Sequence, residues 1–216
     1  FLITKQKSVF PKTISTERPD LVCSSILNGK ISILVENTPY ALIIPALFVD
    51  FFHNPEDYYQ KPINIALTRA LRMIAFLFTI LVPAIYISIV NFHPEVLPEK
   101  LLTSLYYQKL ATPFPTALEL LILLIVFEIL RECDIRTPSA MGTSMSIVGG
   151  LVLGDAAVSA GIVSSAPVII VAITSISGLL FSDIDMINGI RSWRFLFLFF
   201  SICFGLVAVS YTHLTL

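Results

Sequence analysis

Residues 118–136 read LELLILLIVFEILRECDIR, an apolar run with charged residues near both of its ends. Glu119 lies at the start of the run, and a cluster of charges closes it, namely Glu128, Arg131, Glu132, Asp134 and Arg136. The core helix of a soluble protein carries its charges along one face instead. Charges confined to the two ends are typical of a helix that crosses hydrocarbon between two aqueous layers. This stretch therefore predicts a membrane protein.

The composition of the whole chain agrees with this interpretation. Of the 216 residues, 56% are hydrophobic and 13% are charged, whereas soluble domains carry about 25% charged residues. The net charge of −1 gives no indication of nucleic-acid binding. Cys23, Cys133 and Cys203 are too far apart for a CxxC motif or a zinc site. We predict a polytopic, mainly α-helical membrane protein with no metal, no cofactor and no nucleic-acid partner.

Residues 1–62 differ from the rest and are predicted to be the end of a small α/β domain. A short helix is expected after Pro19, which suits a first turn, and Gly29 suits its C-cap. The following stretch predicts a β-hairpin with strands near residues 30–35 and 40–44, joined by a turn at Asn37-Thr38-Pro39.

Residues 63–208 are predicted to form a transmembrane domain of about five helices. The expected segments are about 66–92, 116–131, 143–164, 166–187 and 195–208, judged against hydrocarbon of roughly 30 Å. Residues 93–115 are mixed in character and are expected to lie in the interface. Residues 209–216 turn polar in mid-helix, resemble a translated sequencing adapter, and are expected to take no part in the fold.

Basic residues predict the orientation of these helices. Three arginine pairs flank the expected spans: Arg69 with Arg72, Arg131 with Arg136, and Arg191 with Arg194. If residues 1–62 are cytoplasmic, all three pairs fall on the cytoplasmic side, as the positive-inside rule requires.

Asp155 lies in the middle of the third expected helix. A central Asp costs roughly 2.5–3.5 kcal/mol on insertion scales, so it requires a reason. One reading is a ring of carboxylates, one per subunit, in a cation pathway. The other is a protonated or hydrogen-bonded Asp tied to Ser159 or to a neighbouring helix.

The same segment carries small residues at helical spacing, namely Ser146, Gly150, Gly154, Ala157 and Gly161. Small residues let helix backbones approach closely in lipid. Packing within the chain, a contact between subunits and the lining of a pore all fit this face.

Acidic residues at the helix ends are the other candidates for a pathway. Glu119 and Glu128 are nine residues apart and point to opposite faces, so they form no acid/base pair on one face. We expect Glu128 to bridge to Arg131 and Glu132 to Arg136, which gives a charge-compensated helix end. Glu119 has no partner nearby in the sequence and is expected in an ion pathway or an inter-helix contact, and a carboxylate at the level of the lipid headgroups fits the sequence equally well.

Asp183 and Asp185 follow the fourth expected helix. They are read either as interface residues near Arg191 or as the inner vestibule of a pore.

Enzyme motifs are missing from the sequence. An intramembrane aspartyl protease requires G-x-G-D, but Val152 occupies the position of the first glycine before Asp155. The chain also lacks a phosphate loop, a G-x-S-x-G motif and a histidine-rich cluster. We therefore expect no enzymatic activity.

Several motifs together resemble one family. They are TERPD (16–20), LNGKISILVENTPYALIIP (27–45), FFHNPEDYY (51–59), PFPTALE (113–119), FEILRECDIRTP (127–138) and SIVGGLVLGDAAVSAGIVSSA (146–166). In this order they resemble the A subunit of GerA-type spore germinant receptors and its stage V sporulation paralogue, over residues 16–208.

The resemblance implies a multi-pass protein in the inner membrane of a bacterial spore. It implies self-association into a cation channel that opens to start germination, together with a transporter-like B subunit and a lipoprotein C subunit. A non-conducting scaffold for those subunits is the alternative. A secondary transporter fits less well, because the sequence shows no inverted repeat.

Overall fold

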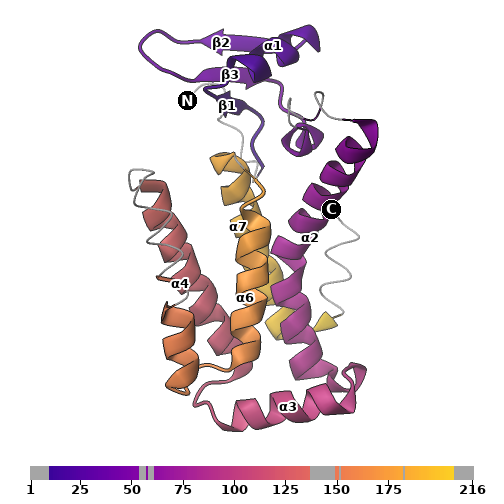
Figure 1. The fold of residues 1–216 in the computed structure, drawn as a ribbon, viewed down its shortest axis with the longest axis vertical. Helices are drawn as coiled ribbons and strands as arrows, with labels where there is room; N and C mark the ends of the chain where they lie inside the picture. The colour runs from indigo at the N-terminus through magenta and orange to yellow at the C-terminus, as the bar shows by residue number, and fades with distance from the viewer. Residues whose placement is uncertain are drawn as a thin grey trace. The chain divides into compact units, whose positions relative to one another are not determined.

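The computed structural model describes residues 10–53, 57, 61–136, 149–150, 152–181 and 183–206 (Figure 1). The chain divides into two compact units. The first comprises residues 1–77 and 177–193, and the second comprises residues 78–176 and 194–216. Two long helices, α2 (Pro62–Phe92) and α7 (Ile184–Phe204), contribute residues to both units.

A three-stranded antiparallel sheet in the order β1-β3-β2 lies in the first unit. Its strands are β1 (Ile14–Thr16), β2 (Ile31–Leu34) and β3 (Ala41–Ile44). The predicted hairpin is present, because β2 pairs with β3 from Ile31 opposite Ile44 to Leu34 opposite Ala41. In the connecting turn Asn37 has a φ of 65°, a left-handed conformation that asparagine tolerates.

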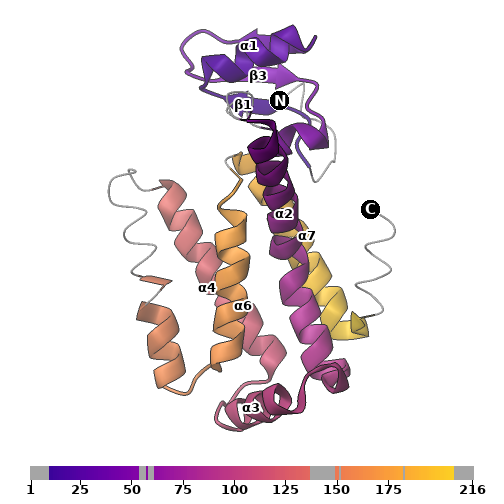
Figure 2. The ribbon, with the colours of Figure 1, turned by 45° about the vertical axis from the view of Figure 1, so that its right-hand side comes forward.

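Helix α1 (Pro19–Leu27) packs on this sheet and contacts all three strands (Figure 2). Pro19 is at the start of the helix, where its missing amide hydrogen is not needed. The helix ends at Leu27 with Asn28 as its C-cap, and Gly29 follows with a φ of 80°, a common way for a helix to end. The helix expected after Pro19 is therefore confirmed.

Aromatic rings connect the short helix η1 (Phe48–Phe52) to other parts of the first unit. The Phe52 ring centroid lies 5.5 Å from that of Phe76 and 5.8 Å from that of Phe181, both edge to face. The Phe10 ring stacks on Trp193 with centroids 6.3 Å apart. Such pairs are worth about 0.5–1.5 kcal/mol each beyond the area that they bury.

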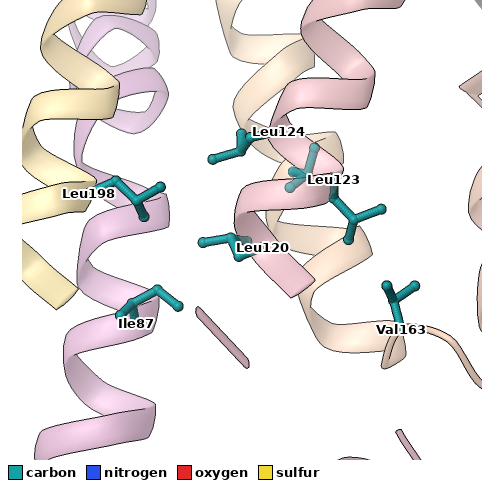
Figure 3. Packing of buried hydrophobic residues seen from close by; sticks show 7 residues of the cluster. Ile87, Leu120, Leu123, Leu124, Val163 and Leu198 are labelled. Atoms are coloured by element: carbon teal, nitrogen blue, oxygen red, sulfur yellow. The ribbon is translucent and has the colours of Figure 1, made fainter. Parts of the chain in front are cut away.

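The core of the second unit is built from helices and one turn that are distant in sequence. Besides parts of α2 and α7, the unit contains η3 (Pro94–Val96), α3 (Glu99–Leu110), α4 (Thr116–Arg136) and α6 (Ser165–Gly178). Figure 3 shows the buried cluster, which consists of Ile87, Leu120, Leu123, Leu124, Val163, Val171 and Leu198. Helix α3 has no buried residue and runs across the ends of α4 and α6 (Figures 1 and 2).

Two serines join α2 to α7 in this core. The hydroxyl oxygens of Ser88 and Ser201 are 2.7 Å apart, and the Ser201 hydroxyl donates to the Ala84 carbonyl at 2.6 Å. Both serines are fully buried. A hydroxyl that bonds across two apolar helices is a common polar contact in membrane bundles.

The expectation of about five transmembrane helices is wrong. Among the described residues, two helices are long and apolar enough to cross a membrane: Pro62–Phe92 and Asp185–Phe204. Helix α6 has 14 residues and is too short. Helix α4 has 21 residues, but Glu119, Glu128 and the charges that follow interrupt its apolar run. Residues 143–148 of the third expected span lie outside the described residues.

The last two expected spans also have different boundaries. Helix α6 ends at Gly178, and α7 begins at Ile184, inside the segment predicted as 166–187. Arg191 and Arg194 therefore lie within α7, although the sequence analysis placed them before the final helix. The physical reason is that Arg194 is buried and has an anionic partner, so the helix accommodates its charge.

Replacing Gly205 tests the end of α7. Gly205 has a φ of 65°, and a Cβ there would lie 2.9 Å from Cγ of Phe92. We expect Gly205→Ala to lower the thermal stability, because the left-handed conformation costs about 1–2 kcal/mol for a residue with a Cβ and the contact adds to that cost.

Gly29→Ala is the matched control, since Gly29 has a φ of 80° with nothing within 4 Å of the new Cβ. Thermal unfolding in detergent, followed by circular dichroism, should show the larger loss for Gly205→Ala. Equal losses would contradict the close contact with Phe92.

Candidate functional site

The Glu119 carboxylate is the central group of the candidate site in the second unit. Its residue is 1% exposed and lies in the first turn of α4. The Pro115 carbonyl accepts the amide hydrogens of Leu118 and Glu119 and so begins the helix. A helix N-terminus carries a partial positive charge, which stabilises a carboxylate in its first turn.

Three donors from two other segments bond to this carboxylate. The Thr112 hydroxyl donates to Oε1 at 2.5 Å. Ser164 donates to Oε2 with its hydroxyl at 2.6 Å and with its backbone N–H at 3.1 Å. Ser164 immediately precedes α6, so the carboxylate faces the N-termini of two helices.

This arrangement explains how an acid is buried without a basic partner. An isolated carboxylate away from water costs several kcal/mol. Among the described residues no basic side chain pairs with Glu119, and hydroxyl and amide donors take the place of water. Its bonds correspond to the expected inter-helix contact, whereas its role in an ion pathway stays a prediction.

Asp155 has a different environment from Glu119. It lies within helical residues 152–159 and is exposed, while its neighbour Gly154 is buried. One face of this segment therefore packs inside the unit, and Asp155 is on another face. Its carboxylate is accessible to solvent or to a partner molecule.

The small residues of this segment contact the rest of the second unit. A Cβ at Gly150 would lie 3.4 Å from the Phe127 ring, and one at Gly154 would lie 3.4 Å from Val168. Ala157 packs against the buried cluster. These contacts favour packing within the chain among the three alternatives.

Two further members of that face are placed differently. Gly161 lies in the turn before α6 with a φ of 66°, and a Cβ there would lie 3.6 Å from the Ala111 carbonyl oxygen. Ser146 lies outside the described residues. The small face therefore continues into the turn that contains Ser164.

The charged end of α4 is connected to α7. Glu128 forms an ion pair with Arg194, whose residue is 3% exposed. The Arg194 guanidinium also lies 5.4 Å from the centre of the Phe195 ring, within cation–π range. Helix α4 extends to Arg136, so the helical spacing assumed for Glu128 with Arg131 and for Glu132 with Arg136 is present. Those two pairs stay predictions.

Asp183 and Asp185 belong to the first unit and lie at the start of α7. The Met186 N–H donates to Oδ1 of Asp183 at 2.9 Å, so Asp183 caps the helix. Burial raises the pKa of the Asp183 carboxyl, the Met186 N–H opposes this rise, and the neighbouring Asp185 adds to it. Asp185 is exposed in the first turn of α7.

Asp57 is 2% exposed and was not predicted from the sequence. Arg72 donates to both of its oxygens, at 2.8 and 3.0 Å, and Nε of Arg69 lies 3.6 Å from Oδ2. Arg72 also donates to the Phe52 carbonyl at 2.9 Å. The signal available in the sequence was that Asp57 precedes Arg69 by 12 residues and Arg72 by 15 residues. Both arginines were interpreted only as markers of membrane orientation.

The whole chain, residues 1–216, matches the family described as Bacillus/Clostridium GerA spore germination protein. The chain belongs to the GerA family. The resemblance that its motifs indicated is thereby confirmed. No solved structure matches the chain.

Curated GerA-family relatives come from bacilli. Spore germination protein KA of Bacillus subtilis (strain 168) is 43% identical over 92% of this chain and 36% of its own length. Spore germination protein B1 of the same organism is 45% identical over 79% of this chain and 35% of its own length. Spore germination protein A1 is 36% identical over 96% of this chain and 44% of its own length. The chain thus spans less than half the length of these relatives.

Removing Asp57 tests the buried ion cluster of this GerA-family chain. We expect Asp57→Ala to destabilise the first unit by about 3–5 kcal/mol, because Arg72 loses its anionic partner while still largely buried. Chemical denaturation followed by Trp193 fluorescence would measure the loss.

Asp20→Ala is the control, because Asp20 pairs with Arg18 at an exposed site and should leave the denaturation midpoint almost unchanged. A midpoint in Asp57→Ala that equals the control would show that the cluster does not support the fold.

The raised pKa of Asp183 predicts a pH dependence of stability. The folded protein holds the Asp183 proton more tightly than the unfolded chain does, so stability falls as pH rises through the interval between the ordinary and the raised pKa. Asp183→Asn keeps an oxygen that accepts the Met186 N–H but cannot ionise, so this part of the fall should disappear.

Melting temperatures measured from about pH 3 to pH 7 would test this prediction, with the exposed Glu95→Gln as control. The same pH profile for wild type and Asp183→Asn would rule it out.

Proposed function

We propose that this chain forms part of a membrane subunit of a spore nutrient-germinant receptor. The observation that carries the proposal is the match of the whole chain to the GerA family, whose relatives are named as spore germination proteins. Two helices of membrane-spanning length and apolarity support a place in the membrane. In this proposal the protein is multi-pass in the inner spore membrane, and the domain formed by residues 1–62 is cytoplasmic.

The subunit is proposed to associate with itself into a cation channel that opens to start germination. Asp155 is exposed on helical residues 152–159, whose small residues pack inside the chain. Self-association around this surface would place one carboxylate per subunit in a ring, which attracts cations. Opening is then a shift between two arrangements of the helices, favoured by partner binding.

The four candidate pathway acids are not equivalent in this proposal. Asp155 is exposed, whereas the oxygens of Glu119 already accept three hydrogen bonds. A cation at Glu119 would first have to displace these donors. Asp183 and Asp185 belong to the other unit and fit a vestibule at the start of α7. We therefore assign the main contact with the ion to Asp155.

The proposed partners are a transporter-like B subunit and a lipoprotein C subunit. Helix α2 offers a surface for such a partner or for lipid, since Ile63, Leu67, Leu71 and Ile74 are exposed. Their spacing of three or four residues puts them on one face of the helix. The same surface favours the second candidate function, a scaffold that holds the other subunits and conducts no ions.

Neutralising Asp155 separates these two functions. In a channel, Asp155→Asn in the full-length subunit should reduce cation release by at least about tenfold, because a unit charge about 4 Å from an ion at an effective dielectric of 20 is worth about 4 kcal/mol. Cation release from spores after addition of germinant gives the measurement.

Glu95→Gln is the control, because Glu95 is also exposed but lies in η3. Co-purification of the partner subunits shows whether the receptor still assembles. If cation release is unchanged in an assembled Asp155→Asn receptor, the scaffold is favoured and the channel is contradicted.

A further inference from the structure

The Glu119 carboxylate holds together two turns that are distant in sequence. Thr112 follows α3 in the connection to α4, and Ser164 ends the turn that connects helical residues 152–159 to α6. One carboxylate accepts hydrogen bonds from both. The two turns lose this link together if the carboxylate is removed.

The start of α6 explains why Ser164 bonds to another helix. A serine before a helix usually accepts a hydrogen bond from the amide of the third helical residue. In α6 that residue is Pro167, which has no amide hydrogen. The Ser164 hydroxyl oxygen therefore has no donor at Pro167, while its hydrogen donates to Glu119 and the Ser164 N–H donates to the same carboxylate. In a capping box, an acid in the first turn of the helix accepts the N–H of the capping residue. Here Glu119 of α4 accepts the Ser164 N–H, so the acid comes from a different helix.

Neighbouring contacts join the same parts of the chain. The Ser165 hydroxyl donates to Oε1 of Gln108 in α3 at 2.9 Å. Gly161 lies against the carbonyl of Ala111. Val163, between them, is 3% exposed and belongs to the buried cluster. The turn before α6 is thus fixed to the end of α3 at several points, with Glu119 as the shared acceptor.

We propose that Glu119 is a latch that holds the turn before α6 against the end of α3, and thereby fixes the position of the Asp155 segment. Helical residues 152–159 connect directly to this turn, so release of the turn frees that segment. The latch itself rests on the hydrogen bonds alone. Its consequence for ion release rests on the proposed function.

The chemistry of the donors suits a latch that opens. All three are neutral groups, two of them hydroxyls that rotate and donate to water or to another acceptor. An ion pair such as Glu128 with Arg194 would leave a buried guanidinium and a partly buried carboxylate when it opens. The Glu119 latch leaves one charge, which stays at the N-terminus of α4.

Hydrogen exchange of the full-length subunit in detergent tests the latch. Glu119→Ala should speed exchange of the amides of residues 160–166 and 168 by at least about tenfold. Thr112→Val and Ser164→Ala each remove one arm and should give smaller increases. Glu119→Gln keeps one acceptor and should lie nearest to wild type. Slow exchange in the α7 core around Phe197 should persist in every variant.

Two substitutions provide matched controls. Thr103→Val removes a hydroxyl that donates to the Glu99 carbonyl on the exposed side of α3, and Ser192→Ala removes one that donates to Asn188 within α7. Neither should change exchange at residues 160–166 and 168. If Glu119→Ala fails to accumulate, Thr112→Val and Ser164→Ala decide the question. Unchanged exchange in both of these variants overturns the latch.

A covalent link then tests the consequence. The double variant Thr112→Cys and Ser164→Cys is made in a chain with Cys23, Cys133 and Cys203 replaced by Ser, and a short bis-maleimide joins the two introduced thiols. The linked receptor should not release cations in response to germinant, while each single cysteine treated in the same way should. Cation release by the linked receptor overturns the control of the Asp155 segment. Two results together would separate the proposals. If Ser164→Ala speeds amide exchange but Asp155→Asn leaves cation release unchanged, the latch is supported and the channel function is contradicted.

Discussion

Burying an ionised group away from water costs several kcal/mol unless other groups replace its hydration. Among the described residues, Asp57 and Glu119 are buried and Glu128 is partly buried, and each is compensated in a different way. Asp57 is held by Arg72 and Arg69, and Glu128 pairs with Arg194. Glu119 is held by hydroxyls and by two helix N-termini. In every case the partner comes from another helix or turn, so the same contacts that satisfy the charge also join distant parts of the chain.

Local signals explain which elements could be predicted from the sequence. Pro19 and Gly29 delimit α1, and Asn37 marks the turn of the hairpin, because each residue acts on its own backbone. The number of membrane-spanning helices could not be obtained in this way. Arg194 was read as a flanking charge, which would end a span. It lies inside α7 because Glu128, 66 residues earlier, neutralises it. A charge near the end of an apolar run indicates the end of a membrane span when it has no partner, but it can lie inside the helix when an opposite charge neutralises it.

The candidate site shows the same limit. Glu119 could be singled out in advance because it lies in an apolar run with no basic partner nearby in the sequence. Its partners are 7 and 45 residues away, and no spacing rule connects them. Pro167 was a usable signal, because a proline at the third position of α6 leaves the preceding serine without its usual donor. Asp57 was missed for a related reason, since its arginines already had an explanation as orientation signals.

The contrast between Asp155 and Glu119 bears on how a signal would reach an ion pathway. A carboxylate that meets a permeating ion needs oxygens that are free to exchange partners, and the exposed Asp155 fits this requirement. A carboxylate whose oxygens accept three bonds from two turns is suited to hold a conformation instead. Asp155 lies in helical residues 152–159, and a short turn joins these residues to Ser164, which donates to Glu119. Movement at Ser164 therefore has a direct covalent path to Asp155, and it also displaces Val163, which belongs to the buried cluster with Leu120 and Val171.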